Sequence, residues 1–562
     1  MQVIERYAPT VSGSDGRDTM TRFRQADSAG PAAEVVTPMG RKAHIWALAF
    51  LVGGFVGMPV VIGLAAGSLG LPRNDAWSYS WIAQHFGRTA QITMLGWNRS
   101  ALVGQVVVLG PLATSITAQH VFVALCGAVC LVAAYHLVLP RAGGRAALLA
   151  AAALGAVPEF GLLTTSYMAD IPALAGVLTC LWAGDRAVRR TSSLSLWLGL
   201  IAGIWAVTVR EQAILAPVAV LIAGWWARRP SRRQVVAGGM IVLAGVVAFE
   251  VWRRTLSGDD PLGSTGISVE ETASVVVKMF FTSGLYLLPV LCAVVRPLRW
   301  RKRTWWLTSG LVLLGLVWVF QSRRSMLLGN YLGDTVAYPV ASVGAPAILP
   351  TALWGLFPVL AVVGAGLLAG QLIEGAFVRD PLLIVAGALL VLGTLAQGAV
   401  GQVIFSRYLL LLVPVVAGVV LPARKGTAGA PSGMTGPGFR FAIVGACLLG
   451  LLGLVLTAAT DSYDAARWRA AEGLVAAGEA PRDVDAGLEW VGTHSDRKFL
   501  PRATGRPSGG GWYVDHFRTS RACVVVSGSP QHRRGAGETH PYPRFVARAL
   551  GTAQLHIYRD RC

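Results

Sequence analysis

Residues 44–70, HIWALAFLVGGFVGMPVVIGLAAGSLG, form an apolar run without Asp, Glu, Lys or Arg. A membrane-spanning helix needs about 20 such residues to cross about 30 Å of hydrocarbon, so the run predicts a crossing. No small-residue cleavage site follows it, and we interpret it as a retained anchor, not a signal peptide. The chain continues directly as LPRNDAWSYSWIAQHF, residues 71–86. One carboxylate, Asp75, therefore lies among tryptophans and a tyrosine where the chain should meet water.

The composition of the whole chain is that of a membrane protein. Of 562 residues, 54% are hydrophobic and only 14% are charged, whereas a soluble domain carries about 25% charged residues. The net charge of +20 could suggest a nucleic-acid partner, but no basic amphipathic helix or zinc-ligand spacing supports one. Arginines clustered between apolar runs are explained by retention of basic residues on the cytoplasmic side. We therefore expect a polytopic membrane protein with no nucleic-acid partner.

Apolar runs recur along the chain and predict thirteen crossings. If the N-terminus is cytoplasmic, every even-numbered crossing ends at a basic cluster, as the positive-inside rule requires. The runs lie near 44–70, 118–139, 145–160, 169–185, 194–209, 211–227, 234–251, 273–295, 304–320, 348–372, 381–400, 405–422 and 439–459. The basic clusters are Arg141 with Arg145, then 186–190, 227–233, 296–303, Arg379 and 423–425.

Three segments follow from this topology. Residues 1–43 are polar and predict a disordered cytoplasmic N-terminus. Residues 44–459 form the transmembrane domain, and 460–562 form a tail outside the cytoplasm. The tail contains a surface-helix pattern, YDAARWRAAEGLVAAG, and the β-rich runs ACVVVSGS and AQLHIYRD. We expect an all-α membrane domain followed by a small α/β domain.

The seven cysteines divide by location. Five fall in apolar runs, where a thiol is an ordinary packing residue. Cys523 and Cys562 are the only cysteines of the tail. An oxidising exterior favours a disulfide between them, although Cys562, as the last residue, could also be frayed and free.

Three acids fall on the outer side of the predicted membrane. Asp75 follows the first crossing, Glu159 ends the third, and Asp170 opens the fourth in TTSYMADIPALAG, residues 164–176. Asp75 and Asp170 could each simply cap a helix, and Tyr79 could belong to an aromatic belt at the interface. Acids near hydrocarbon are costly and tend to be functional or paired. Three on one side suggest a shared polar cavity.

Arginines on the same side supply the complementary charge. Arg210 occupies the turn between the fifth and sixth crossings, Arg323 and Arg324 follow the ninth, and Arg407 with Tyr408 begins the twelfth. Each arginine alone could be an interface anchor. The planar guanidinium, however, donates two parallel hydrogen bonds to phosphate and stays charged. Acids and arginines together fit a site that breaks a linkage in a phosphate-bearing lipid.

Three stretches in this order resemble the GT-C glycosyltransferases, especially the protein-mannosyltransferase-like branch that includes the lipid A aminoarabinose transferases. They are RNDAWSYSWIAQHF after the first crossing, TTSYMADIPA at the start of the fourth, and SRYLLLLVP at 406–414. The resemblance spans residues 44–425. The chain departs from it at Asn74, where members often carry a second acid, and at Leu411, where they carry proline. Hard cations prefer several carboxylates, so Asn74 weakens the case for a divalent metal. We assign no residue as a metal ligand, and a divalent metal cofactor stays a weakly supported alternative.

The resemblance implies a membrane glycosyltransferase of the cell envelope, in the plasma (inner) membrane. Its donor would be a polyprenyl-phosphate-linked sugar, used on the outer face beside membrane lipids, and its acceptor a lipid, a glycan or a protein. Asp75 would be the general base, and Asp170 would orient the acceptor or balance the arginines. Arg210, Arg323, Arg324 and Arg407 would bind the donor phosphate, with Glu159, Tyr79 and Tyr408 lining the acceptor site or cavity.

Two other classes stay open at this point. A transporter or lipid flippase could use the same charges along a substrate path, but no inverted repeat or matched pair of broken helices is evident. A scaffold protein could keep the fold without catalysis, since Asn74 stands beside Asp75.

Overall fold

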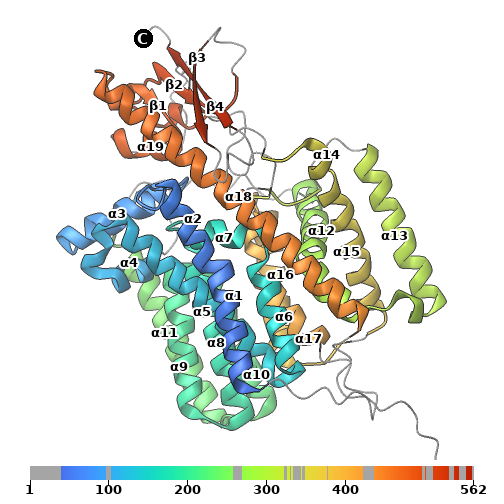
Figure 1. Cartoon of the computed structure of the whole chain (residues 1–562). Coiled ribbons are helices and arrows are strands. Elements are labelled where there is room, and N and C mark those ends of the chain that lie inside the picture. The colour runs from blue at the N-terminus through green and yellow to red at the C-terminus, as the bar shows by residue number, and fades with distance from the viewer. Residues whose placement is uncertain are drawn as a thin grey trace, which may run out of the picture. The chain divides into compact units, whose positions relative to one another are not determined.

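A computed structural model describes residues 40–95, 103–256, 269–321, 326–329, 331–332, 344, 348–375, 377–421, 436–496, 500, 510–530, 537–543 and 552–559. Helices dominate these residues, and a small sheet lies beside α18 and α19 (Figure 1). The first half of the chain contains α1 (Arg41–Val52), η1 (Gly53–Gly57), α2 (Met58–Ala66), α3 (Ala76–Thr89), α4 (Val103–Leu109), η2 (Gly110–Thr114), α5 (Ile116–Ala142), α6 (Gly144–Gly155), α7 (Pro158–Thr164), α8 (Asp170–Arg190), α9 (Ser193–Val209), η3 (Glu211–Ile214), α10 (Leu215–Ala227) and α11 (Arg232–Arg253).

The second half continues in the same way before the chain reaches the sheet. Its helical elements are α12 (Val269–Val294), η4 (Pro297–Arg299), α13 (Lys302–Gln321), α14 (Thr351–Trp354), α15 (Leu356–Ile373), α16 (Pro381–Ala399), η5 (Ser406–Leu409), α17 (Leu412–Val420) and α18 (Pro437–Ala476). The tail adds η7 (Pro481–Asp483), β1 (Val484–Asp485), α19 (Leu488–His494), η8 (Val514–His516), β2 (Val524–Ser527), β3 (Glu538–Pro543) and β4 (Thr552–Arg559).

The protein is a multi-pass integral membrane protein, but fewer of its helices meet the length of a full crossing than the sequence predicts. Among the described residues, nine are long and apolar enough, or ten if the bent pair α6 and α7 counts as one span. The other three predicted runs form shorter apolar helices, at Ser193–Val209, Glu211–Ala227 and Ser406–Val420. A helix of 17 residues is about 26 Å long, less than a hydrocarbon core of about 30 Å.

Local sequence explains where several of these helices begin. The hydroxyl of Ser115 accepts a hydrogen bond from the Ala118 N–H at the start of α5, and Ser192 does the same for α9. Asp380 caps α16 through the Leu383 N–H. Such caps satisfy backbone donors that the first turn leaves unpaired.

Close packing of helices depends on glycine where α12 crosses α15. A Cβ on Gly284 would lie 2.3 Å from the Ala365 nitrogen, and one on Gly364 would lie 2.2 Å from the Gly284 oxygen. Only glycine allows the two backbones to approach so closely. Both helices are therefore fixed against each other by their smallest residues.

A cluster of charges joins three helices at the C-terminal end of α8. The Arg141 guanidinium from α5 lies 2.6 Å from Asp185 of α8 and 2.9 Å from Asp380 at the start of α16. Arg189 contacts the same two acids at 2.8 and 3.4 Å. Asp185 lies fifteen residues beyond Asp170, which corresponds to about 22 Å along the helix. The cluster thus attaches one end of α8 to α5 and to the start of α16, and Asp170 lies at the other end of α8.

The tail forms the predicted small mixed domain, with one difference. The last predicted crossing and the predicted surface helix are a single 40-residue helix, α18. The four strands are ordered β1-β2-β4-β3, with β1 and β2 parallel and the other pairs antiparallel. Side chains of the second half of α18, such as Tyr463 and Leu474, share a core with the strands. Helicity continues past Thr460 because the polar residues that follow are paired inside the protein.

Cys523 precedes β2 and is disulfide-bonded. Cys562 lies outside the described residues, so the predicted pairing of the two stays a prediction. The membrane side of the tail also stays a prediction.

Candidate active site

The N-terminal end of α8 gathers three charged side chains that are far apart in the sequence. Asp170 is the first residue of α8, Arg210 lies between α9 and η3, and Arg407 lies in η5. Asp170 forms an ion pair with Arg210, and its carboxylate lies 3.3 Å from Nε of Arg407. The side chains of Asp170 and Arg407 are each only 5% exposed. The buried Arg407 and the partly buried Arg210 thus share one acid, which leaves this trio with one net positive charge.

Aromatic rings hold both guanidinium groups. The Arg210 guanidinium lies 4.3 Å from the ring centre of Tyr408, and that of Arg407 lies 4.3 Å from the ring centre of Phe405. Phe405 and Tyr408 meet edge to face at 5.8 Å. Cations over aromatic faces are attracted by the ring quadrupole. The rings therefore fix the direction in which the arginines point.

The side chain of Arg407 presents a buried hydrogen-bond donor at this site. Nη1 of Arg407 is buried and makes no hydrogen bond within the part of the chain that the structure describes. A buried donor without a partner costs about 1–3 kcal/mol. An anion entering this site would supply the missing acceptor.

Glu159 is buried in contact with Ser406, the residue that precedes Arg407 in the sequence. Its carboxylate, fully shielded from solvent, accepts hydrogen bonds from the hydroxyls of Ser406 and Tyr286. Ser406 directly precedes Arg407, so Glu159 fixes the backbone that carries this arginine. The structure places Glu159 in this network and not among the residues that line the pocket described next.

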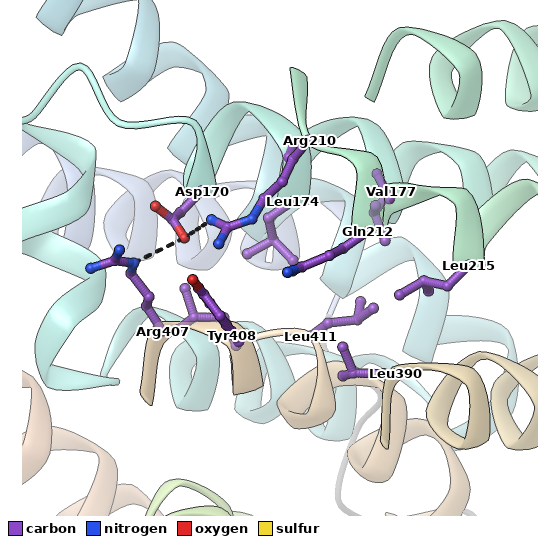
Figure 2. Close-up of a pocket in the computed structure, with 13 residues that line it drawn as sticks. Asp170, Leu174, Val177, Arg210, Gln212, Leu215, Leu390, Arg407, Tyr408 and Leu411 are labelled. Atoms are coloured by element: carbon purple, nitrogen blue, oxygen red, sulfur yellow. Dashed lines mark hydrogen bonds and ion pairs between the residues drawn. The ribbon is translucent and has the colours of Figure 1, made fainter. Parts of the chain in front are cut away.

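A pocket with two chemically different ends opens at this site (Figure 2). Asp170, Arg210, Arg407 and Tyr408 form the polar end, where Figure 2 shows Asp170 between the two arginines. Val177, Leu215, Leu390 and Leu411 line the opposite, apolar end, and Leu174 and Gln212 lie between the two ends. A ligand with an anionic head and a hydrocarbon tail would match both ends.

Asp75 lies close to this pocket without lining it. The half-buried Asp75 precedes α3, but its side chain makes no capping hydrogen bond to that helix. It interacts electrostatically with Arg407 and Tyr331. Helix capping therefore does not account for Asp75, and its carboxylate lies near the charge that Arg407 carries.

Two further predicted tyrosines are also at the site. Tyr79, one turn into α3, is buried and interacts electrostatically with Arg210. Tyr408 packs on Arg210, as described above. Arg323 and Arg324 lie outside the described residues. In the part of the chain that the structure describes, no three His, Cys, Asp or Glu side chains converge in a way that could hold a metal ion.

The sequence patterns did not point to four residues of the site. Tyr286 and Ser406 bond Glu159, Gln212 lines the pocket, and Tyr331 interacts with Asp75, Asp170 and Arg407. Burial raises the pKa of the Tyr331 phenol above its ordinary value, so this phenol remains protonated and able to donate. A usable signal existed for Tyr286 and Ser406. The first is a hydroxyl inside an apolar run, and the second adjoins Arg407.

One segment of the chain matches a known protein family. Residues 112–252 match the sequence profile of the dolichyl-phosphate-mannose-protein mannosyltransferase family. The stretch contains Glu159, Asp170 and Arg210 but neither Asp75 nor Arg407. This match confirms the predicted family resemblance and, with it, the prediction that the protein is a membrane glycosyltransferase.

Other comparisons add less. No curated protein matches the chain. Among solved structures, one that matches is the crystal structure of ArnT from Cupriavidus metallidurans bound to undecaprenyl phosphate. It is 16% identical, with a TM-score of 0.37, over 80% of this chain and 85% of that chain.

Proposed function

We propose that this protein transfers a sugar from a polyprenyl-phosphate donor to a lipid, glycan or protein acceptor on the outer face of the membrane. The observation that carries the proposal is the pocket with two ends. Two arginines bracket Asp170 at one end, and leucine and valine side chains line the other. A polyprenyl phosphate has a matching anionic head and hydrocarbon tail. The donors named by the matching family are of the same class.

The reaction follows from the charges around the pocket. Asp75 takes the proton of the acceptor hydroxyl while the acceptor oxygen bonds to the anomeric carbon of the sugar. The bond between that carbon and the phosphate oxygen breaks, the anomeric centre inverts, and polyprenyl phosphate leaves with an added negative charge. General-base help of this kind contributes about 10²–10⁴-fold.

Arg210 and Arg407 act on the leaving group. Preorganised charges aimed at the atom where charge develops are often the largest contribution to catalysis. Arg407 has a buried nitrogen that makes no hydrogen bond among the described residues, and both guanidinium groups are held by aromatic rings. Asp170 keeps the two cations together and lowers their mutual repulsion. Its role is therefore to hold the phosphate-binding arginines in position.

The test is transfer of label by membranes that contain the full chain. Membranes are incubated with a panel of radiolabelled polyprenyl-phosphate sugars, and lipid, glycan and protein fractions are separated. We expect label to move covalently into one of these fractions, and to do so only when the protein is present. Label that crosses the membrane while still attached to its polyprenyl phosphate would instead identify a flippase. That outcome would overturn the proposal.

A further inference from the structure

Asp75 lies in a short connector between α2 and α3 whose first anchor is Arg73. The Arg73 side chain is 4% exposed. It forms ion pairs with Asp461, and with Asp464 at 3.4 Å, both on α18. It also donates to Ser68 Oγ at 2.8 Å and to Thr165 Oγ1 at 3.1 Å. The residue two positions before Asp75 is therefore bound to a helix almost 400 residues later in the chain.

The second anchor is Trp77, two positions after Asp75. Its indole is 2% exposed and meets Phe517 of the tail edge to face at 5.9 Å. Gly492 of α19 packs against the same indole. A Cβ added there would lie 2.4 Å from the ring. The tail domain thus contacts the connector at a second point, through Phe517 and Gly492.

Between the anchors the connector is tightly turned. Asn74 has φ of 44°, in the left-handed region that non-glycine residues adopt only when their surroundings impose it. The Ala76 N–H donates to the Arg73 carbonyl at 2.8 Å, and the Trp77 N–H donates to that of Asn74 at 3.3 Å. Fixing residues 73 and 77 therefore fixes the backbone of Asp75.

The charges on α18 extend this connection into the tail. Asp464, which contacts Arg73, also lies 3.2 Å from Arg467, and Arg467 forms an ion pair with Glu489 of α19. All four side chains are at most 4% exposed. Opposite charges thus alternate from the connector to the tail domain. Breaking one buried pair leaves an uncompensated charge, so the series behaves as a unit.

From these contacts we propose that the C-terminal part of the chain, from Asp461 onward, positions the catalytic base. Arg73 and Trp77 are its positioning residues: they touch neither donor nor acceptor and act through Asp75. This inference rests on the proposed function, because it takes Asp75 as the base. It assigns the tail a role in the chemical step itself.

A glycine pair provides the first test. In the full-length protein, Gly492→Ala adds a methyl group against the Trp77 indole, whereas Gly473→Ala, on the exposed part of α18, meets nothing within 4 Å. Amide hydrogen exchange of residues 71–86 is measured for both. We expect Gly492→Ala to speed exchange in this peptide at least tenfold and Gly473→Ala to leave it unchanged. Equal exchange in both variants would overturn the inference, and this readout does not depend on any enzymatic activity.

A double-mutant cycle provides the second test. Transfer from the labelled donor is measured for Arg73→Gln, Asp75→Asn and the double variant, with Arg440→Gln, an exposed arginine near the start of α18, as the control. We expect Arg73→Gln to lower kcat at least tenfold while the KM for donor changes less than twofold. In the Asp75→Asn background the same change should cost nothing further. A merely structural role would lower activity in both backgrounds.

The outcomes separate this inference from the proposed function. If Asp75→Asn is inactive but Arg73→Gln and Gly492→Ala are as fast as wild type, the positioning role is wrong and the base stands. If Asp75→Asn is fully active, the proposed base is wrong, and the positioning role falls with it. Arg73→Lys should recover part of the lost kcat, because it retains the charge that pairs with Asp461.

Discussion

Replacing Arg407 by glutamine removes the arginine best placed to stabilise the departing phosphate. Its side chain is 5% exposed, and its Nη1 makes no hydrogen bond within the described residues. Charge stabilisation in such a dry site is strong. Loss of one donor to a developing negative charge costs about 2.7–4 kcal/mol, or about 10²–10³ in kcat. We expect Arg407→Gln to slow sugar transfer by that factor.

The structure also predicts that this variant folds. Asp170 keeps its ion pair with Arg210 when Arg407 is removed, so no buried acid is left alone. Breaking a buried pair completely would cost about 3–5 kcal/mol of stability, and Arg407→Gln should cost clearly less. The measurement combines single-turnover transfer of radiolabelled sugar with thermal melting of the purified full chain.

Arg189→Gln is the matched control. Like Arg407, Arg189 is the second arginine on an acid of α8, but it lies at the other end of the helix and is 41% exposed. Asp185 and Asp380 keep Arg141 as a partner in its absence. This variant should transfer sugar at the wild-type rate. If Arg407→Gln were as active as Arg189→Gln, phosphate stabilisation by Arg407 would be refuted.

Three other predictions concern parts of the chain around the site. Glu159→Gln should lower kcat about tenfold or more, because it weakens the bonds to Ser406 and Tyr286 that hold the backbone before Arg407; an unchanged rate in single-turnover assays would count against this role. A reporter that fluoresces only in the cytoplasm, fused after Cys562, should stay dark, because the alternation of arginine clusters along the chain predicts that the tail lies outside; bright cells would disprove that topology. Mass spectrometry without reduction should find Cys523 and Cys562 joined, and alkylation of both thiols would disprove the pairing.

The helices could be predicted from the sequence because a long apolar run carries its own signal. The boundary between the membrane domain and the tail could not be predicted in this way. The chain turns polar at Asp461, which reads as an end of the last crossing, yet Asp461 and Asp464 are buried against Arg73 and α18 continues. A pairing across so much sequence depends on tertiary structure. Arg73 likewise reads as an ordinary loop charge until its partners are known.

The site was partly predictable for a similar reason. Alternating arginine clusters predict that Asp170, Arg210 and Arg407 lie on one side of the membrane, and the structure brings these three together. The predicted side of the membrane, however, does not tell which residues contact one another. It did not reveal that Glu159 bonds Ser406 and Tyr286, or that Tyr331 joins Asp75 near Arg407.

Transfer by Asp75→Asn tests the central claim most directly. Asparagine keeps the size of the side chain and removes the base, and helix α3 loses no capping bond, because Asp75 makes none. Purified wild-type and variant full-length protein are compared in single-turnover transfer from a radiolabelled polyprenyl-phosphate sugar, with thermal melting to confirm folding. We expect a folded variant that transfers sugar at least about a hundredfold more slowly. Wild-type transfer by a folded Asp75→Asn protein would contradict the assignment of Asp75 as the base.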